Sequence, residues 1–197
     1  MARKTKLDVL YSIRGYRRCF DPDNGYTFIF PGDWLADQTL YQRYARRVEQ
    51  QNPLDPPSLK KKPRRDFSEP TAAFGPPGST GELNVSVVVA PIESGFALKQ
   101  LGTPSKAGEL ILNSFIAPPT QQDKVAELLS AAELDGGYYR LEYTVVSASK
   151  GWKRHNIAVY GTSNNNLLYT LNAQCNEKSW SEEKEKLFTV ANSFRIL

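Results

Sequence analysis

The hydrophobic and polar positions along the chain predict more strands than helices. Alternating or β-branched apolar residues predict strands within residues 16–31, 83–90, 138–147, 153–160 and 167–173. The first range reads as a hairpin, because Asn24-Gly25 in its middle supplies the positive φ that a tight turn needs. Residues 161–166, rich in Asn, connect the last two strands as a second hairpin. Neighbouring strands joined in this way indicate an antiparallel sheet.

Two segments have the pattern of amphipathic helices. Ser179 and Glu182 have the spacing of a capping box. The apolar stripe at helical spacing behind it consists of Trp180, Leu187, Val190, Ala191 and Phe194. A second helix is predicted for residues 103–115, and its expected apolar face contains Leu110, Ile111, Ser114 and Phe115.

Residues 123–133 fit two kinds of element. Val125, Leu128, Leu129 and Ala132 have helical spacing, but Asp135-Gly136-Gly137 is typical of the turn of a hairpin. The pattern alone leaves helix and strand open.

Differences in basic-residue and proline content divide the chain into an N-terminal arm and one domain. Residues 1–15 form a basic N-terminal arm, and residues 16–197 form a single α+β domain in which helices pack on an antiparallel sheet. A Pro-rich basic insertion interrupts this domain at about residues 43–82 and holds seven of the 13 prolines. Prolines at this density do not sustain a helix or a strand ladder, so the insertion is expected to be a long loop.

Charge follows the same division. Residues 1–65 contain 14 basic and 7 acidic side chains (+7), whereas residues 66–197 contain 11 and 14 (−3). The net charge of +4 is therefore the sum of a basic N-terminal part, residues 1–65, and a slightly acidic remainder, residues 66–197. No run of 18 apolar residues is present, which is what a membrane-spanning helix requires. Met1-Ala2-Arg3-Lys4-Thr5-Lys6 is followed by no apolar segment, so we expect no secretory signal peptide.

Signatures of catalysis are scarce. The single histidine, His155, lies in a predicted strand, and the sequence has no G-x-S-x-G motif, so we expect no enzyme. Cys19 and Cys175 are far apart in sequence and are interpreted either as two half-buried thiols or as a disulfide. The basic segments could contact nucleic acid, but acidic protein or lipid surfaces are the favoured partners.

The order of these motifs resembles the PsbP family, extrinsic lumenal proteins of the photosynthetic membrane. The matching segments are residues 20–34, 137–143, 153–157, 166–174 and 180–194. The N-terminal arm and the long insertion depart from the oxygen-evolving subunit, so the chain is more similar to the PsbP-domain or PsbP-like branch.

This resemblance implies an α-β-α sandwich with a central antiparallel sheet, and it assigns residues 125–132 to a strand. It implies calcium as the cofactor to consider, and His155 as a ligand for a divalent metal. It also implies a location in the thylakoid lumen of the chloroplast, peripheral to the membrane, after removal of a transit peptide. The lumen is relatively oxidising, which favours a Cys19–Cys175 bridge.

The function that follows is a non-enzymatic protein that docks on a photosynthetic membrane complex, photosystem II or photosystem I, and supports its assembly or stability. The expected docking residues are basic: Arg14, Arg17, Arg18, Arg43, Arg46, Arg47, Lys60, Lys61, Lys62, Arg64 and Arg65. Two alternatives are a Mog1-like module that binds a soluble regulator and a thiol-redox-regulated accessory protein.

Overall fold

The structure is a computed structural model, and it describes residues 7–37, 69–78, 81–120 and 123–197. Its strands are β1 (Tyr16–Asp21), β2 (Tyr26–Pro31), β3 (Leu35–Ala36), β4 (Ala72–Gly75), β5 (Asn84–Pro91), β6 (Lys124–Leu134), β7 (Tyr138–Ser147), β8 (Trp152–Ser163), β9 (Leu167–Asn176) and β10 (Arg195–Ile196). Its α-helices are α2 (Pro104–Ile111) and α3 (Trp180–Asn192). Short helical turns are η1 (Leu7–Val9), η2 (Leu98–Leu101), η3 (Leu112–Ile116) and η4 (Glu177–Ser179). None of the helices in these ranges has the length and apolar character needed to cross a bilayer.

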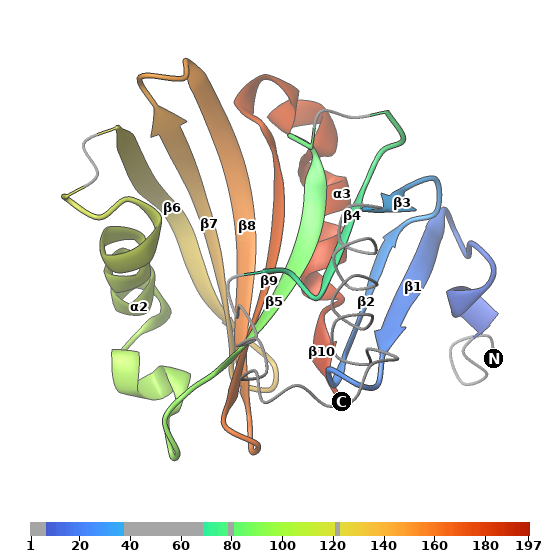
Figure 1. The fold of residues 1–197 in the computed structure, drawn as a ribbon, viewed down its shortest axis with the longest axis horizontal. Helices are drawn as coiled ribbons and strands as arrows, with labels where there is room; N and C mark the ends of the chain where they lie inside the picture. The colour runs from blue at the N-terminus through green and yellow to red at the C-terminus, as the bar shows by residue number, and fades with distance from the viewer. Residues whose placement is uncertain (1–6, 38–68, 79–80, 121–122) are drawn as a thin grey trace, which may run out of the picture.

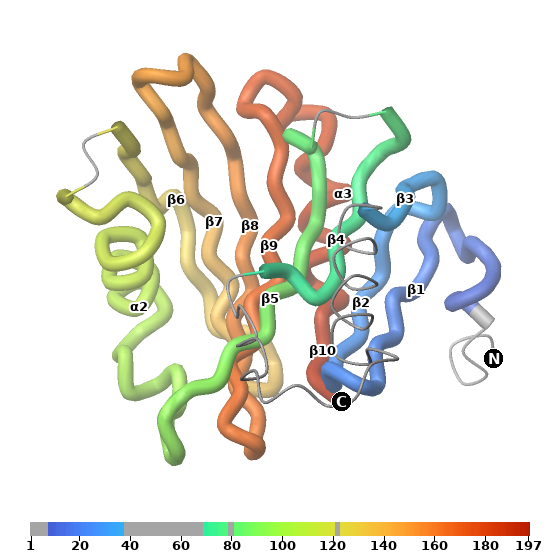
Figure 2. The backbone as a smooth tube through the Cα atoms, in the orientation of Figure 1, coloured from blue at the N-terminus to red at the C-terminus, as the bar shows by residue number. Residues whose placement is uncertain are grey.

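The strands form two antiparallel sheets. The large sheet has the order β3-β4-β5-β9-β8-β7-β6, and the small sheet has the order β1-β2-β10. In Figures 1 and 2, α2 lies beside β6 at one edge of the large sheet, and α3 lies behind β9 and β5. The β1–β2 hairpin lies at the opposite edge, with the C-terminal β10 beside β2.

The pleat of β7 shows that the helices cover opposite faces of the large sheet. Tyr138 packs in the core under α3, and its neighbour Tyr139 packs in the core under α2. The α3 core also receives the aromatic residues of β2, so the small sheet joins the α3 layer. The α-β-α sandwich with a central antiparallel sheet is therefore confirmed.

Several local expectations are corrected. Ser179 makes no side-chain cap, because η4 precedes α3 and places Ser179 in helical conformation. Helix α2 buries Ala107, Gly108 and Ile111 against the sheet, and the chain passes into a π-helical turn at Leu112. Leu110 lies outside the buried face of α2, and the change of helical phase directs Phe115 away from the sheet, so both residues of the expected apolar face are exposed.

The Pro-rich insertion is not loop throughout. Its residues 72–75 form β4, which pairs with β5 and carries Phe74 into contact with Phe30, with ring centroids 4.1 Å apart. The prolines of this part, Pro70, Pro76 and Pro77, lie before and after the strand, so the ladder loses no N–H within it. Residues 43–68 of the insertion lie outside the described residues. For residues 123–133, the sequence pattern left helix and strand open. The strand that the resemblance implies for residues 125–132 is confirmed as part of β6.

Candidate functional site

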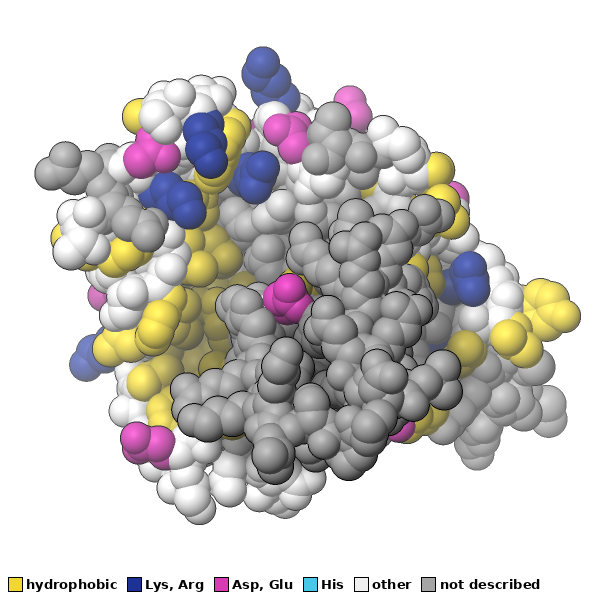
Figure 3. Space-filling model, viewed as in Figure 1, with side chains coloured by type: hydrophobic (Ala, Val, Ile, Leu, Met, Phe, Trp, Pro, Cys, Tyr) yellow, Lys and Arg dark blue, Asp and Glu magenta, His cyan; other side chains and the backbone are white. Residues whose placement is uncertain are grey.

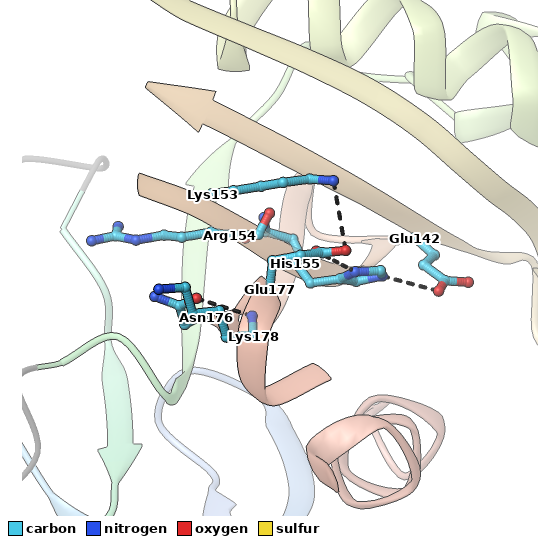
Figure 4. Close-up of polar contacts among 8 residues, drawn as sticks. Glu142, Lys153, Arg154, His155, Asn176, Glu177 and Lys178 are labelled. Carbon is cyan, nitrogen blue, oxygen red and sulfur yellow. Dashed lines mark hydrogen bonds and ion pairs between the residues drawn. The ribbon is translucent and has the colours of Figure 1, made fainter. Parts of the chain in front are cut away.

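A buried polar arrangement surrounds His155, near the start of β8 (Figure 4). His155 is 2% exposed and points to the α3 face of the large sheet, level with Thr144 of β7 and Cys175 of β9. It lies on the same face as the buried aromatic core of α3.

Two carboxylates bracket the imidazole ring. Nε2 of His155 lies 3.0 Å from Oε1 of Glu142 on β7, and Nδ1 lies 2.9 Å from Oε2 of Glu177 in η4. Each carboxylate has a further partner, since Ser130 Oγ donates to Glu142 at 2.9 Å and Lys153 Nζ lies 3.6 Å from Glu177. Burial of these polar groups is tolerated because they are paired with one another.

An aromatic ring stacked on the histidine completes the cluster. The Trp180 ring, at the start of α3, stacks on the His155 ring with centroids 3.4 Å apart and an interplanar angle of 9°. Lys184, one turn along α3, lies over the same indole at 5.9 Å. The His155 cluster, which we define as Glu142, His155, Glu177 and Trp180, therefore links β7, β8, η4 and α3.

This geometry is better suited to holding the structure together than to chemistry. A Ser–His relay needs a free imidazole nitrogen facing a hydroxyl, and both nitrogens of His155 face carboxylates. Among the described residues, no group of three or more His, Cys, Asp or Glu side chains is arranged to hold a metal ion.

Calcium does not fit the cluster. Calcium takes six to eight oxygen ligands, whereas Glu142 and Glu177 lie on opposite nitrogens of an imidazole ring. In the Asp21–Gly25 turn, both carboxylate oxygens of Asp21 accept hydrogen bonds from Asn24, at 2.9 and 2.7 Å. The Asp21 carboxylate therefore stabilises the turn through both of its oxygens, and no calcium ion is needed to explain its position.

The docking residues expected near the N-terminus lie in different environments. Arg18 Nε donates to Asp8 at 2.8 Å, and Arg17 lies over the Phe30 ring at 5.8 Å. Arg14 is exposed. The remaining expected docking residues, Arg43, Arg46, Arg47, Lys60, Lys61, Lys62, Arg64 and Arg65, lie outside the described residues.

Sequence reasoning missed a second basic group, at the end of the large sheet where His155 lies. Strand register brings together the ends of β6, β7, β8 and β9. The basic residues there, which we call the basic rim, are Lys124, Lys150, Lys153, Arg154 and Lys178. Figure 3 shows Lys and Arg side chains, with acidic ones among them, over the ends of β6–β8. In Figure 4, Arg154 points away from His155, and its guanidinium lies over the Trp152 ring at 4.4 Å.

Apart from the consecutive Lys153 and Arg154, these basic residues are separated in sequence, so no long run of like charges marked them. The available signal was positional: the ends of consecutive antiparallel strands meet at one end of a sheet.

The two cysteines are free thiols, so the structure shows the alternative without a bridge. They lie on strands of different sheets, Cys19 on β1 and Cys175 on β9. Burial, aided by Asp21, raises the pKa of Cys19 to about 12, and burial beside Glu183 and Glu177 raises the pKa of Cys175 to about 11. Thiols that keep their protons are weak nucleophiles, so neither has the character of a redox-active cysteine.

The fold and the site together define a class: a small antiparallel α-β-α sandwich in which a buried histidine is paired with two carboxylates. The family model described as PsbP matches residues 14–196, and the chain belongs to the PsbP family.

Relatives agree with this assignment. The chain is 43% identical over its whole length to PsbP domain-containing protein 7, chloroplastic, of Arabidopsis thaliana, of which 71% is covered. It is 27% identical to CyanoP of Thermosynechococcus vestitus, over 92% of this chain and 86% of that one.

Solved structures support the fold. The solution structure of cyanobacterial PsbP (CyanoP) from Synechocystis sp. PCC 6803 superimposes with a TM-score of 0.63 at 25% identity, over 94% of this chain and 95% of that one. A mutant form of the protein Mog1 matches with a TM-score of 0.50 at 10% identity, over 92% of this chain and 95% of that one, which shows the shared fold alone.

Proposed function

We propose that this protein is a non-enzymatic accessory protein of the chloroplast thylakoid lumen that docks on a photosynthetic membrane complex and supports its assembly or stability. The observation that carries the proposal is membership of the PsbP family across residues 14–196, together with similarity to a relative that is named chloroplastic. The His155 cluster supports the non-enzymatic part, because its nitrogens and carboxylates are engaged with one another.

Electrostatics provides the docking mechanism. The basic rim and the basic residues of the first 65 positions are the surfaces that acidic lumenal loops of a photosystem would meet. Exposed charges attract over about 10 Å at 0.1 M salt and over about 3 Å at 1 M, so docking should weaken as salt rises. The partner in this proposal is photosystem II or photosystem I.

The test is affinity isolation of the tagged full chain from gently solubilised thylakoids at low salt, with a wash at about 1 M NaCl. We expect photosystem subunits to co-purify and to be lost in the wash. The charge-reversed variant Lys150→Glu/Lys178→Glu should recover less of the complex. The matched control Lys99→Glu/Lys106→Glu changes exposed lysines beside and within α2 and should recover as much as the unaltered chain.

Two results would overturn the proposal. Recovery of a soluble regulator without any photosystem subunit would support the Mog1-like alternative. Full retention of the complex at high salt would show that charge does not hold it.

A further inference from the structure

The N-terminal segment carries two of the most exposed apolar side chains of the described residues. Leu10 is 70% exposed and Tyr11 is 69% exposed, and they are adjacent in the chain directly after η1. Single exposed apolar residues are common, but two consecutive large ones on a short connecting turn form a projecting apolar tip. We call this feature the Leu10–Tyr11 turn.

The turn is held on both sides. Before it, the buried carboxylate of Asp8 accepts from Arg18 Nε at 2.8 Å, which ties η1 to β1. After it, Ile13 and Tyr16 exchange backbone hydrogen bonds of 2.8 and 3.1 Å. These contacts fix the position of the tip before any partner arrives, which lowers the entropic cost of binding.

Gly32 fastens the same segment to the end of β2. Its N–H donates to the Gly15 carbonyl at 2.8 Å, and a Cβ at this position would lie 2.9 Å from Cβ of Ser12. The turn can approach β2 this closely only because residue 32 has no side chain.

An exposed basic residue follows the tip. Arg14 comes three residues after Tyr11 in the chain and is exposed. The acidic residue of the segment, Asp8, is already paired with Arg18. Figure 3 shows hydrophobic side chains projecting where the N-terminal segment of Figure 1 lies, with a Lys or Arg side chain beside them.

We propose that the Leu10–Tyr11 turn binds an anionic lipid surface directly. Leu10 enters the boundary of the acyl chains, Tyr11 lies at headgroup level, and Arg14 contacts the anionic headgroups. Tyrosine is enriched at membrane–water interfaces, and basic residues near an anionic leaflet are attracted to it.

A lipid surface fits this shape better than a protein partner does. A specific protein interface buries about 800 Å² per partner around a packed centre, whereas two side chains projecting from a convex turn offer far less area. A bilayer needs no complementary pocket, and a few apolar side chains combined with basic charge suffice for reversible binding. The inference is independent of the photosystem docking proposed above.

The test is flotation of the full chain with vesicles at low salt, comparing neutral phosphatidylcholine with a mixture containing about 30% phosphatidylglycerol. We expect binding to the anionic vesicles and little to the neutral ones. Leu10→Ser/Tyr11→Ser should weaken binding about tenfold or more, because the tip then has little apolar surface to bury. Arg14→Asn should weaken it about fivefold. Arg14 has a φ of 53°, a conformation that Asn tolerates better than Arg, so this variant should remain folded.

Matched controls come from the other side of the molecule. Phe115→Ser removes a side chain that is 76% exposed on η3, and Lys106→Glu changes an exposed charge on α2. Both should bind anionic vesicles as the unaltered chain does. In Tyr11→Trp, a blue shift of the added fluorescence and quenching by brominated lipid should report entry into the bilayer.

Equal binding by the unaltered chain and Leu10→Ser/Tyr11→Ser would overturn the inference, as would no binding to anionic vesicles. If the double variant lost only its association with protein-containing thylakoids, the turn would belong to a protein interface and the inference would also fail. Because the vesicles contain no protein, these outcomes are separate from those of the photosystem isolation.

Discussion

His155 shows how one buried polar side chain can stabilise a fold through its neighbours. Its two carboxylate partners are largely shielded from water, with 14% of the Glu142 side chain and 33% of the Glu177 side chain exposed. A buried charge is tolerated only while its partner is present, and removing one side leaves the other unpaired. The cluster therefore stabilises the native state as a set.

We predict that His155→Phe lowers the free energy of unfolding by about 2–4 kcal/mol. A phenyl ring can still stack on Trp180, but Glu142 and Glu177 lose the ring nitrogens that face them. Urea unfolding followed by tryptophan fluorescence measures the change.

The control is Glu177→Gln, which keeps an acceptor in a more exposed position and should cost less than about 1 kcal/mol. In a double-mutant cycle, Glu142→Leu should cost less in the His155→Phe background than alone. Strict additivity would contradict the coupling of these side chains.

Gly161 is a second position where a single substitution should change stability, because an added Cβ has no room there. A Cβ there would lie 2.6 Å from two ring carbons of Tyr138 and 2.9 Å from Cδ1 of Ile196. The ring is fixed, because Tyr138 Oη accepts from the Ile196 N–H at 2.9 Å. We predict that Gly161→Ala destabilises the protein by about 1–3 kcal/mol through overpacking, measured as a loss of thermal or urea stability.

A smaller neighbour should relieve this clash. In the Tyr138→Leu background, the same Gly161→Ala change should cost less than it does in the unaltered protein. An equal cost in both backgrounds would assign the effect to the backbone of β8.

The partners of His155 illustrate what could not be predicted from sequence at this scale. The sequence marks His155 as a candidate, whereas Glu142 lies within the matching segment 137–143 and carries no signal of its own. Their contact depends on the register of β7 against β8, which pairs Thr144 with His155 and places Glu142 diagonally beside it. Strand identity follows from local pattern, but register depends on packing across the whole sheet.

At the scale of elements, β6 explains why periodicity was ambiguous. Of the residues at helical spacing, Leu128 faces the α2 core, whereas Val125 and Leu129 are 65% and 46% exposed. A bulge between Leu128 and Ser130 inserts one residue into the strand, so the positions that face the α2 core are Ala126, Leu128 and Ala131. This spacing of two followed by three departs from the strict alternation of a strand, so the sequence pattern did not single out a strand. The hairpin turn after β6 was the more reliable indicator, because turn chemistry is unaffected by the bulge.

The last turn of α3 connects three layers of the molecule. Phe194, just after it, is fully buried and contacts Tyr26 of β2 and Tyr138 of β7, with ring centroids 6.1 and 6.3 Å away. We predict that Phe194→Ala lowers the free energy of unfolding by about 3–5 kcal/mol, because the cavity opens where both sheets meet α3. Chemical denaturation measures the loss.

A change nearby should have little effect. Leu197 is 60% exposed, and its backbone N–H, which donates to Gly25, is retained on substitution. Leu197→Ala should therefore stay within about 0.5 kcal/mol of the unaltered protein. Equal losses in the two variants would refute a specific role for Phe194.

At the scale of the whole molecule, two thiols and three phenols have pKa values above their ordinary values. Burial raises the pKa values of Cys19, Cys175, Tyr26, Tyr143 and Tyr160. These groups keep their protons in the folded state at a pH where the unfolded chain releases them. Their contribution to stability is complete below about pH 9, the ordinary thiol value, and is lost as pH rises above it.

We predict that the urea midpoint falls steeply between pH 9 and 11. Each thiol lowers the free energy of unfolding by about 1.4 kcal/mol per pH unit above its unfolded value, and the tyrosines follow from about pH 10. Absorbance at 295 nm should show the buried phenols ionising together with unfolding. A gradual rise of that absorbance in a protein that stays folded would contradict the prediction.

The α+β class with an antiparallel sheet was predictable from hairpins and apolar stripes, because these signals are local, whereas the α-β-α sandwich followed from the resemblance to the PsbP family. The distribution of charge was predictable only in part. Charge runs identify a basic N-terminal part, whereas the basic rim is assembled from Lys124, Lys150 and Lys178, which lie on separate elements. A surface formed by the ends of several strands exists only after the sheet has assembled.

The small sheet has a consequence for the timing of folding. Its first two strands, β1 and β2, lie far before β10, which supplies the third strand, and Ser193 Oγ accepts from the Ile29 N–H across 164 positions of sequence. In a chain that emerges from a ribosome or a translocation channel, the β1–β2 hairpin lacks its third strand until β10 has also emerged. Contacts of such long separation make folding slow, so the nascent chain should depend on chaperones during this interval.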